Sequence, residues 1–404
     1  MKLVLGLFFI CSLNSAFAQA WKTLPKGVRI LGYRNVTTSK IDSNFNQFGS
    51  QSSLGTSFQV DAATFNSMTG NAVTPGTDVN SEAYNNLIVG AYQVDASAQV
   101  NVQGTGFGIG LSERVMFYAE IAYYKAQVKT KLKRTKGNTY EKTAQIIENN
   151  NGGILDEVQA ENLRRLIDVN ERTIQSVITN HFGYRPLGDW YGTGYGDMET
   201  GLMIKVAEAS TSGLLFYPGV ILPTGRVDDP DILQDIGFGD GQFDFFGELA
   251  TGYVVNDKLS FGTSLRYTYQ APGEKTIRVP TSQDFTLSDY KGNFQVKYGD
   301  KLNYMLSATF AFNDWFSVTP IYRYMLQDSA TYDSQYTDAN AFLEAGSFKE
   351  EHQGQITGSI SSIAPFLKKK FVLPAQINVN LVKTFHGYNV PNASRFELEF
   401  RMLF

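Results

Sequence analysis

The chain has 404 residues, a formal net charge of −4, and 13% aromatic residues that include 22 Tyr and 29 Phe. The acidic balance argues against nucleic acid as a partner. No stretch beyond the first residues approaches the roughly 20 apolar residues that a membrane-spanning helix needs, which argues against an inner-membrane protein.

The amino end has the layout of a secretory signal peptide. An apolar run over residues 3–13 is followed by a small-x-small triplet that ends at Ala18, which suits cleavage at that point. We therefore expect residues 1–18 to be a signal peptide and residues 19–404 to form a single exported domain. Because the one cysteine, Cys11, lies inside the signal, the mature chain would carry no disulfide and no thiolate metal site.

Alternation of apolar and polar residues dominates the first part of the mature chain. Residues 27–40 predict a first strand, and residues 41–89, rich in Ser, Asn, Gly and Thr, predict a long polar loop. From Tyr92 to Gln103, six apolar residues alternate with six polar ones, which is typical of a half-buried strand. After Gly106 the phase changes, and we expect a slip in the strand there.

A different period follows a short strand over residues 115–123. Residues 134–197 form a long insertion, in which apolar residues recur at steps of three and four from Ile154 to His181. With i,i+4 pairs such as Glu161 and Arg165, this pattern predicts an amphipathic helix over 154–181. Two roles stay open for the helix: its apolar stripe packs on the outer rim or on other loops, or it dips into a pore mouth and gates it.

The remaining sequence alternates strands with short and long connections, as an up-and-down barrel does. Together with the three strands above, the further segments bring the total to about 12 antiparallel strands. They are residues 198–207, 214–222, 245–255, 259–269, 304–312, 316–325, 353–363, 372–384 and 395–404.

The last strand, over residues 394–404, alternates large apolar residues with charged ones and stops on Phe404. One face suits hydrocarbon and the other suits a wet lumen. It resembles the C-terminal signal of outer-membrane barrel proteins, in which a terminal Phe is read by the barrel assembly machinery. We therefore expect an all-β transmembrane antiparallel β-barrel in the bacterial outer membrane, in contact with the lipid bilayer and lipopolysaccharide.

The non-lipid faces of these strands supply the candidate residues of a lumen or transport path. Five acids and five bases among them give no net sign, so no charge-selective ring is predicted. Two roles stay open: an interior salt-bridge lattice that fills a narrow barrel, or a polar path for solutes. The candidates are Asp95, Gln99, Asn101, Glu120, Lys205, Glu248, Arg266, Arg323, Arg395, Glu397, Glu399 and Arg401.

Three glycine-rich motifs carry a family resemblance. They are Gly194-Tyr-Gly-Asp197, Leu222-Pro-Thr-Gly225 and the run from Gly237 to Asp244. This region, roughly residues 190–270, resembles outer-membrane barrels of the meta-pathway phenol-degradation type, which are similar in style to fatty-acid and aromatic-hydrocarbon channels. The resemblance implies uptake of aromatic or other hydrophobic compounds.

An acidic loop holds the one candidate for a metal. Asp228, Asp229 and Asp231 form an oxygen-rich cluster of the kind that suits Ca²⁺, although the spacing is not that of an EF-hand. Exposed acids of this kind are also commonly solvated, so both interpretations stay open. We expect no cofactor.

The sequence offers few candidate catalytic residues. Its histidines number three: His181, His352 and His386. The serine-bearing segment of outer-membrane phospholipase A is absent, and nothing fixes an acid beside a histidine. We therefore expect a protein that is not an enzyme: a passive outer-membrane channel or transporter for small hydrophobic or aromatic compounds. The alternative is a non-conducting surface scaffold or adhesin barrel, and an outer-membrane hydrolase ranks third.

Overall fold

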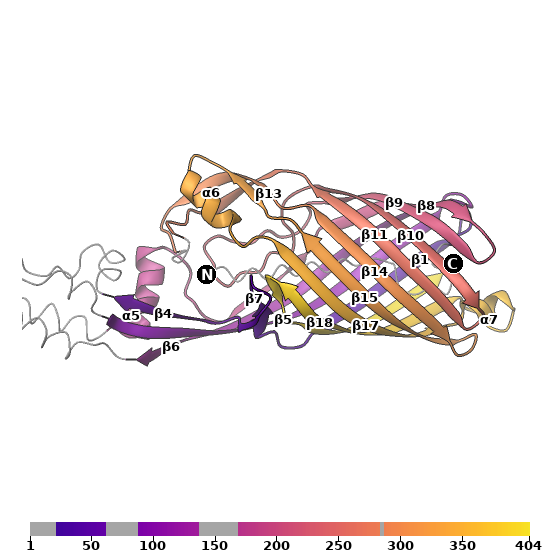
Figure 1. Cartoon of the computed structure of the whole chain (residues 1–404), viewed down its shortest axis with the longest axis horizontal. Helices are drawn as coiled ribbons and strands as arrows, with labels where there is room; N and C mark the ends of the chain where they lie inside the picture. Colours follow the sequence, from indigo (N-terminus) through magenta and orange to yellow (C-terminus); the bar gives the residue numbers. More distant parts are fainter. Residues whose placement is uncertain (1–21, 62–87, 137–168, 283–286) are drawn as a thin grey trace, which may run out of the picture.

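A closed antiparallel barrel of twelve strands forms the body of the protein (Figure 1). The computed structural model describes residues 22–61, 88–136, 169–282 and 287–404. The pairing of β5 with β6 closes the sheet, and the predicted fold class and strand number are confirmed. The barrel strands are β1 (Arg29–Thr38), β5 (Ile88–Gly110), β6 (Val115–Lys136), β8 (Met198–Glu208), β9 (Ser212–Leu222), β10 (Asp244–Asn256), β11 (Leu259–Gln270), β14 (Lys301–Ala311), β15 (Phe316–Gln327), β17 (Lys349–Ser361), β18 (Ala375–Tyr388) and β20 (Ser394–Leu403).

Burial is reversed relative to a water-soluble protein. On β20, Phe396 and Leu398 face outward and are 46% and 42% exposed, whereas Glu397 and Glu399 face inward and are 1% and 3% exposed. The same alternation runs through β10, β11 and β18. A closed barrel with an apolar outer band is one of the two structures that can cross a bilayer with every backbone group paired.

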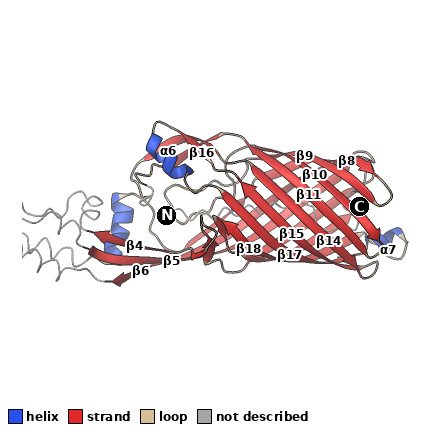
Figure 2. Ribbon diagram, viewed as in Figure 1, coloured by secondary structure: helices blue, strands red, loops and turns tan. Residues whose placement is uncertain are grey.

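The two ends of the barrel differ in the length of their connections. Short turns join β5–β6, β8–β9, β10–β11 and β14–β15, and a turn containing α7 (Ile363–Leu367) joins β17 to β18; we call this the turn end. Long segments meet at the opposite loop end (Figure 2). They hold β2 (Ser43–Phe45), β3 (Gln51–Ser53), β12 (Gly273–Arg278), β13 (Lys291–Lys297), β16 (Thr331–Asp333), α6 (Thr337–Glu344) and β19 (Val390–Pro391).

Strands β5 and β6 are 23 and 22 residues long and project well beyond the other strands at the loop end (Figure 1). A membrane crossing needs about 9–11 residues of strand, so roughly half of this hairpin stands outside the barrel. Its far part pairs with β4 (Thr56–Asp61) and β7 (Trp190–Tyr195). The predicted loops 41–89 and 134–197 therefore each contribute a strand to the main sheet.

The predicted phase slip after Gly106 is wrong. Pairing of β5 with β6 is regular from Tyr92 to Gly110, so the same set of positions faces inward throughout. Only the environment changes: Val102 faces inward and is buried, whereas Phe107 faces outward and is 38% exposed. The apolar face is the inner one where the strand stands above the barrel wall, and the outer one where it crosses lipid.

The predicted helix over 154–181 is wrong in its extent. Asn170 has an extended backbone and caps α5 (Glu171–Ser176), which continues as the π-helical turn η1 (Val177–His181). Residues 154–168, like the signal peptide, lie outside the described residues. Ile174 packs in one buried cluster with Tyr92 of β5, and α5 lies beside the projecting part of the hairpin (Figure 1), so the described part of the helix packs on other loop-end elements. None of the described helices is long and apolar enough to cross a membrane.

Candidate functional site

The inner surface of the barrel divides into two contrasting walls. The first, which we call the polar wall, comprises the inner faces of β11, β14, β15, β17, β18 and β20. Its side chains bond across neighbouring strands: Thr357 donates to Asn380 at 2.7 Å, and Asn380 donates to Glu397 at 3.0 Å. Buried polar groups on its β17 and β18 strands are Gln353, Gln355, Thr357, Ser359, Gln376, Asn378, Asn380 and Thr384.

The inward charges of β20 in the polar wall are paired. Arg401 and Glu397 are each 1% exposed. The guanidinium of Arg401 lies 2.5 Å from Glu399, and that of Arg395 lies 2.7 Å from Glu397, which also pairs with Arg34. Such low exposure on the inner face means that neighbouring side chains cover these groups, as expected for the predicted salt-bridge lattice.

The opposite side of the lumen is the apolar wall, on β1, β6, β8, β9 and β10. Sequence reasoning missed it, because Leu215 and Tyr217 face inward beside the equally apolar Leu214 and Phe216 on the lipid side. With both faces apolar, β9 has no alternation to read. The buried cluster of this wall consists of Ile30, Met116, Tyr118, Leu215, Tyr217, Phe246 and Ala250, and Leu24 packs against it from the segment before β1.

One group of charges interrupts the apolar wall. Glu199 accepts a hydrogen bond from the Tyr118 hydroxyl at 2.9 Å and one from Arg266 at 2.7 Å. Arg266 lies 3.9 Å from Glu248 and stacks over the Phe246 ring, 3.5 Å from its centroid. Glu120 is the direct cross-strand neighbour of Glu199. Three carboxylates and one guanidinium thus share this part of the lumen, which we call the acidic cluster.

Nine of the twelve predicted lumen residues face inward, and three do not. Asp95, Gln99 and Asn101 lie on the outer face of β5, since Val94, Val100 and Val102 fill the inner one. The prediction failed because it assigned polar residues to the lumen at every level. The inward nine are Glu120, Lys205, Glu248, Arg266, Arg323, Arg395, Glu397, Glu399 and Arg401.

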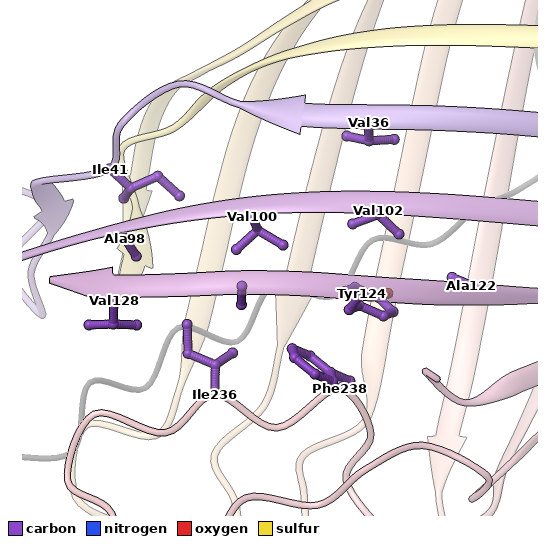
Figure 3. Close-up of a cluster of buried hydrophobic side chains, with 11 residues drawn as sticks. Val36, Ile41, Ala98, Val100, Val102, Ala122, Tyr124, Val128, Ile236 and Phe238 are labelled. Carbon is purple, nitrogen blue, oxygen red and sulfur yellow. The ribbon is translucent and has the colours of Figure 1, made fainter. Parts of the chain in front are cut away.

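At the loop end, residues 223–243 fold back against the inner face of β5 and β6. Figure 3 shows Ile236 and Phe238 of this mouth segment pointing at the hairpin. The Phe238 ring stacks on Tyr124 with 5.2 Å between centroids and 8° between planes. Arg226 pairs with Asp235 at 2.5 Å and lies over the Phe238 ring, so the segment is held by apolar and ionic contacts together.

The three glycine-rich motifs meet at the base of the mouth segment. The Asp197 carboxylate accepts hydrogen bonds from the backbone N–H of Gly225 at 2.8 Å and of Asp240 at 3.3 Å. A Cβ on Gly239 would lie 2.4 Å from Asp197 Oδ1, and one on Gly225 2.8 Å from the Cα of Gly239. Burial raises the pKa of Asp197 to about 6. The motifs therefore fix a backbone crossing that no larger residue allows.

The three aspartates of the calcium candidate are each engaged with a cation. Asp228 pairs with Lys275, and Asp229 lies 3.7 Å from Arg185. Asp231 accepts from Arg278 at 2.6 Å and from Lys291 at 2.9 Å. Among the described residues, no group of three or more His, Cys, Asp or Glu side chains is arranged to hold a metal ion.

The three histidines lie beside aromatic rings. His352 Nδ1 lies 2.7 Å from the Tyr322 hydroxyl and Nε2 lies 2.8 Å from Glu350. The His386 ring is 5.4 Å from that of His352 and meets Phe45 edge-on. These side chains form part of an aromatic surface near the loop end.

Comparison with known proteins adds to this geometry at the level of the fold. No protein-family model and no curated protein matches the sequence. An outer membrane channel from Pseudomonas putida F1 superimposes over 96% of this chain and 100% of its own, with a TM-score of 0.54 and 12% identity. The fold is that of an outer-membrane channel. Its lipid-facing band and closed barrel place the protein in the bacterial outer membrane.

Two toluene transporters align more loosely. TodX of Pseudomonas putida covers 94% of this chain and 89% of its own at a TM-score of 0.33 and 9% identity. TbuX of Ralstonia pickettii covers 94% and 90%, with a TM-score of 0.33 and 8% identity.

Proposed function

We propose that the protein is a channel for passive uptake of small hydrophobic or aromatic compounds across the outer membrane. The observation that carries this proposal is the inner face of β6. Along it, Val128, Ala126, Tyr124 and Ala122 follow one another from the mouth segment down to Tyr118 and Met116 of the apolar wall, with Glu120 as the one charged residue in the series. Apolar solutes bind such a surface because it lowers the area they expose to water.

The channel would be oriented with its turn end in the periplasm and its loop end outside, as outer-membrane barrels are. Solutes would then meet the mouth segment first. In this conformation Ile236 and Phe238 pack on β5 and β6, so we infer that displacement of this segment precedes uptake.

Flux through proteoliposomes tests the proposal. The wild type is expected to pass toluene faster than glucose, and Ile236→Ser with Phe238→Ser is expected to raise toluene flux by loosening the mouth segment. Phe48→Ser is the matched control, because Phe48 is 76% exposed. Toluene flux equal to that of protein-free liposomes, in both wild type and double variant, would sink the proposal.

The packed polar wall favours a second candidate, a non-conducting surface scaffold or adhesin barrel. Its inner side chains are covered, with Asn378 and Asn380 at 0% exposure. Planar-bilayer recordings separate the two: a scaffold gives no conductance steps even when the mouth segment is loosened. For the third candidate, a hydrolase, we expect the solubilised protein to leave phospholipid and peptide substrates intact.

We infer two further partners, lipopolysaccharide and the barrel assembly machinery, with support from features of the outer surface. Lys125, Lys129 and Lys131 stand exposed on the outer face of β6 directly beyond Tyr123, where the lipid-facing band ends. Phosphates of lipopolysaccharide would pair with such a row. The exposed ring of Phe404 suits recognition by the barrel assembly machinery.

A further inference from the structure

Glu120 is an inward-facing carboxylate to which the described residues donate no hydrogen bond. Its residue is 8% exposed and faces the lumen from β6. Within the described parts of the chain it makes no hydrogen bond and no ion pair, whereas its neighbour Glu199 is bonded by both Tyr118 and Arg266. A buried carboxylate without a donor costs free energy, and a donor supplied from outside removes that cost.

The nearby cations are already committed to other acids. The charges of Arg34, Arg266 and Arg401 act on Glu120, yet each of these guanidinium groups bonds to a different carboxylate: Glu397, Glu199 and Glu399 respectively. Within the acidic cluster itself, three carboxylates face one guanidinium. The local field around Glu120 therefore favours a positive group.

The surroundings of Glu120 on its own strand are apolar or aromatic. Tyr118, Ala122 and Tyr124 share its inward face, at two and four residues' distance along β6. Ring faces attract both apolar groups and cations. A solute that follows the apolar wall thus meets the Glu120 carboxylate on a strand face that also carries two rings, Tyr118 and Tyr124.

From this geometry we propose that Glu120 binds the ammonium or hydroxyl head of an otherwise apolar solute, with an amine preferred. The proposal rests on the uptake function above and narrows its substrate class to small ring or chain compounds that carry one hydrogen-bond donor. Anionic compounds such as carboxylates are disfavoured at the same point, because they would meet three acids.

A set of matched ring compounds tests the proposal in proteoliposomes: benzylamine, benzyl alcohol, toluene and benzoate. We expect benzylamine flux to saturate and to exceed that of toluene, with benzyl alcohol between them and benzoate slowest. Glu120→Gln is expected to raise the benzylamine concentration needed for half-saturation about ten-fold, the factor for one lost charge-assisted hydrogen bond, and to change toluene flux by much less. Asp95→Asn, which removes the same charge from the outer face, is the matched control.

Binding of benzylamine to the detergent-solubilised protein, followed by calorimetry, gives a second measurement that needs no flux. Heat-dependent gel migration checks that each variant is folded. Benzylamine that behaves like toluene, or that binds the Glu120→Gln variant as tightly as the wild type, overturns the amine site while leaving uptake standing. Absence of toluene flux overturns the uptake function instead, and calorimetry then decides the amine site alone.

Discussion

The polar and apolar walls face each other across one lumen, yet different interactions hold their side chains: hydrogen bonds in the polar wall and apolar packing in the other. In the polar wall, Asn378 and Asn380 find partners on both neighbouring strands. In the apolar wall, Leu215 and Tyr217 are covered by packing, and the acidic cluster lies among these apolar side chains. The difference supports the polar wall as chiefly a lattice that holds the barrel, and the apolar wall as the surface that a solute would contact once the mouth segment is displaced.

Removing a charge from the lattice should have the largest effect. Arg401→Met leaves Glu399 buried without its partner, and breaking a buried pair in this way costs about 3–5 kcal/mol. Urea unfolding in detergent micelles or lipid measures this loss in the free energy of unfolding. Lys383→Met, on the outward side of β18, is the control, and an equal loss in both variants would contradict the lattice role.

The second largest loss of stability is expected in the mouth segment, above the apolar wall. Phe238→Ala removes the stacking on Tyr124 and the contact with Arg226, and loss of a buried Phe costs about 3–5 kcal/mol. Because the contact joins the mouth segment to the hairpin, we expect faster hydrogen exchange over residues 223–243 and unchanged exchange in the barrel. Uniform loss of protection along the chain would show instead that the segment is part of the barrel's own stability.

A smaller, pH-dependent effect is expected at Asp197. Its pKa is raised by burial to about 6 from an ordinary 3.8, so the folded mouth binds the proton more tightly than the unfolded chain does. This contribution to stability is complete below the ordinary value and is lost as pH rises through about 6. Proteolysis of the mouth segment should accelerate over that rise, and Asp197→Asn should flatten the profile; an unaltered profile in the variant would assign the dependence to another group.

The smallest effect is expected outside both walls. Asp95→Asn breaks an exposed pair with Lys133 on the projecting hairpin, and exposed pairs contribute little to stability. The urea midpoint should match that of the wild type within error. A clear shift would mean that the outer face of the hairpin is covered by a partner.

Alternation in the sequence was sufficient to predict the barrel and most of the inward residues of the polar wall. It located Glu397, Glu399 and Arg401 on the inner face because their strand neighbours Phe396, Leu398 and Phe400 face lipid. It failed for Asp95, because periodicity reports which face is apolar and not which face is inside. On β5 the apolar face is the inner face before Gln103 and the outer face after it.

Other misses have separate causes. The apolar wall on β9 left no alternation, since both of its faces are apolar. The prediction of one continuous helix through Asn170 failed because an Asn that caps a helix also fits inside a pattern of threes and fours. Glu120 lacks a hydrogen-bond partner within the part of the chain that the structure describes, and this depends on contacts between strands distant in sequence, which no local pattern encodes.

The pairing of β1 with β20 joins residues separated by most of the chain: Ile30 lies opposite Leu403, and the Arg29 N–H donates to the Phe404 carbonyl at 2.8 Å. Until this seam forms, the sheet has two free edges able to pair with other chains. Such a distant closure is slow to find. We therefore expect the barrel to seal late in folding, and a chain that stalls before this step to be the form most prone to aggregate.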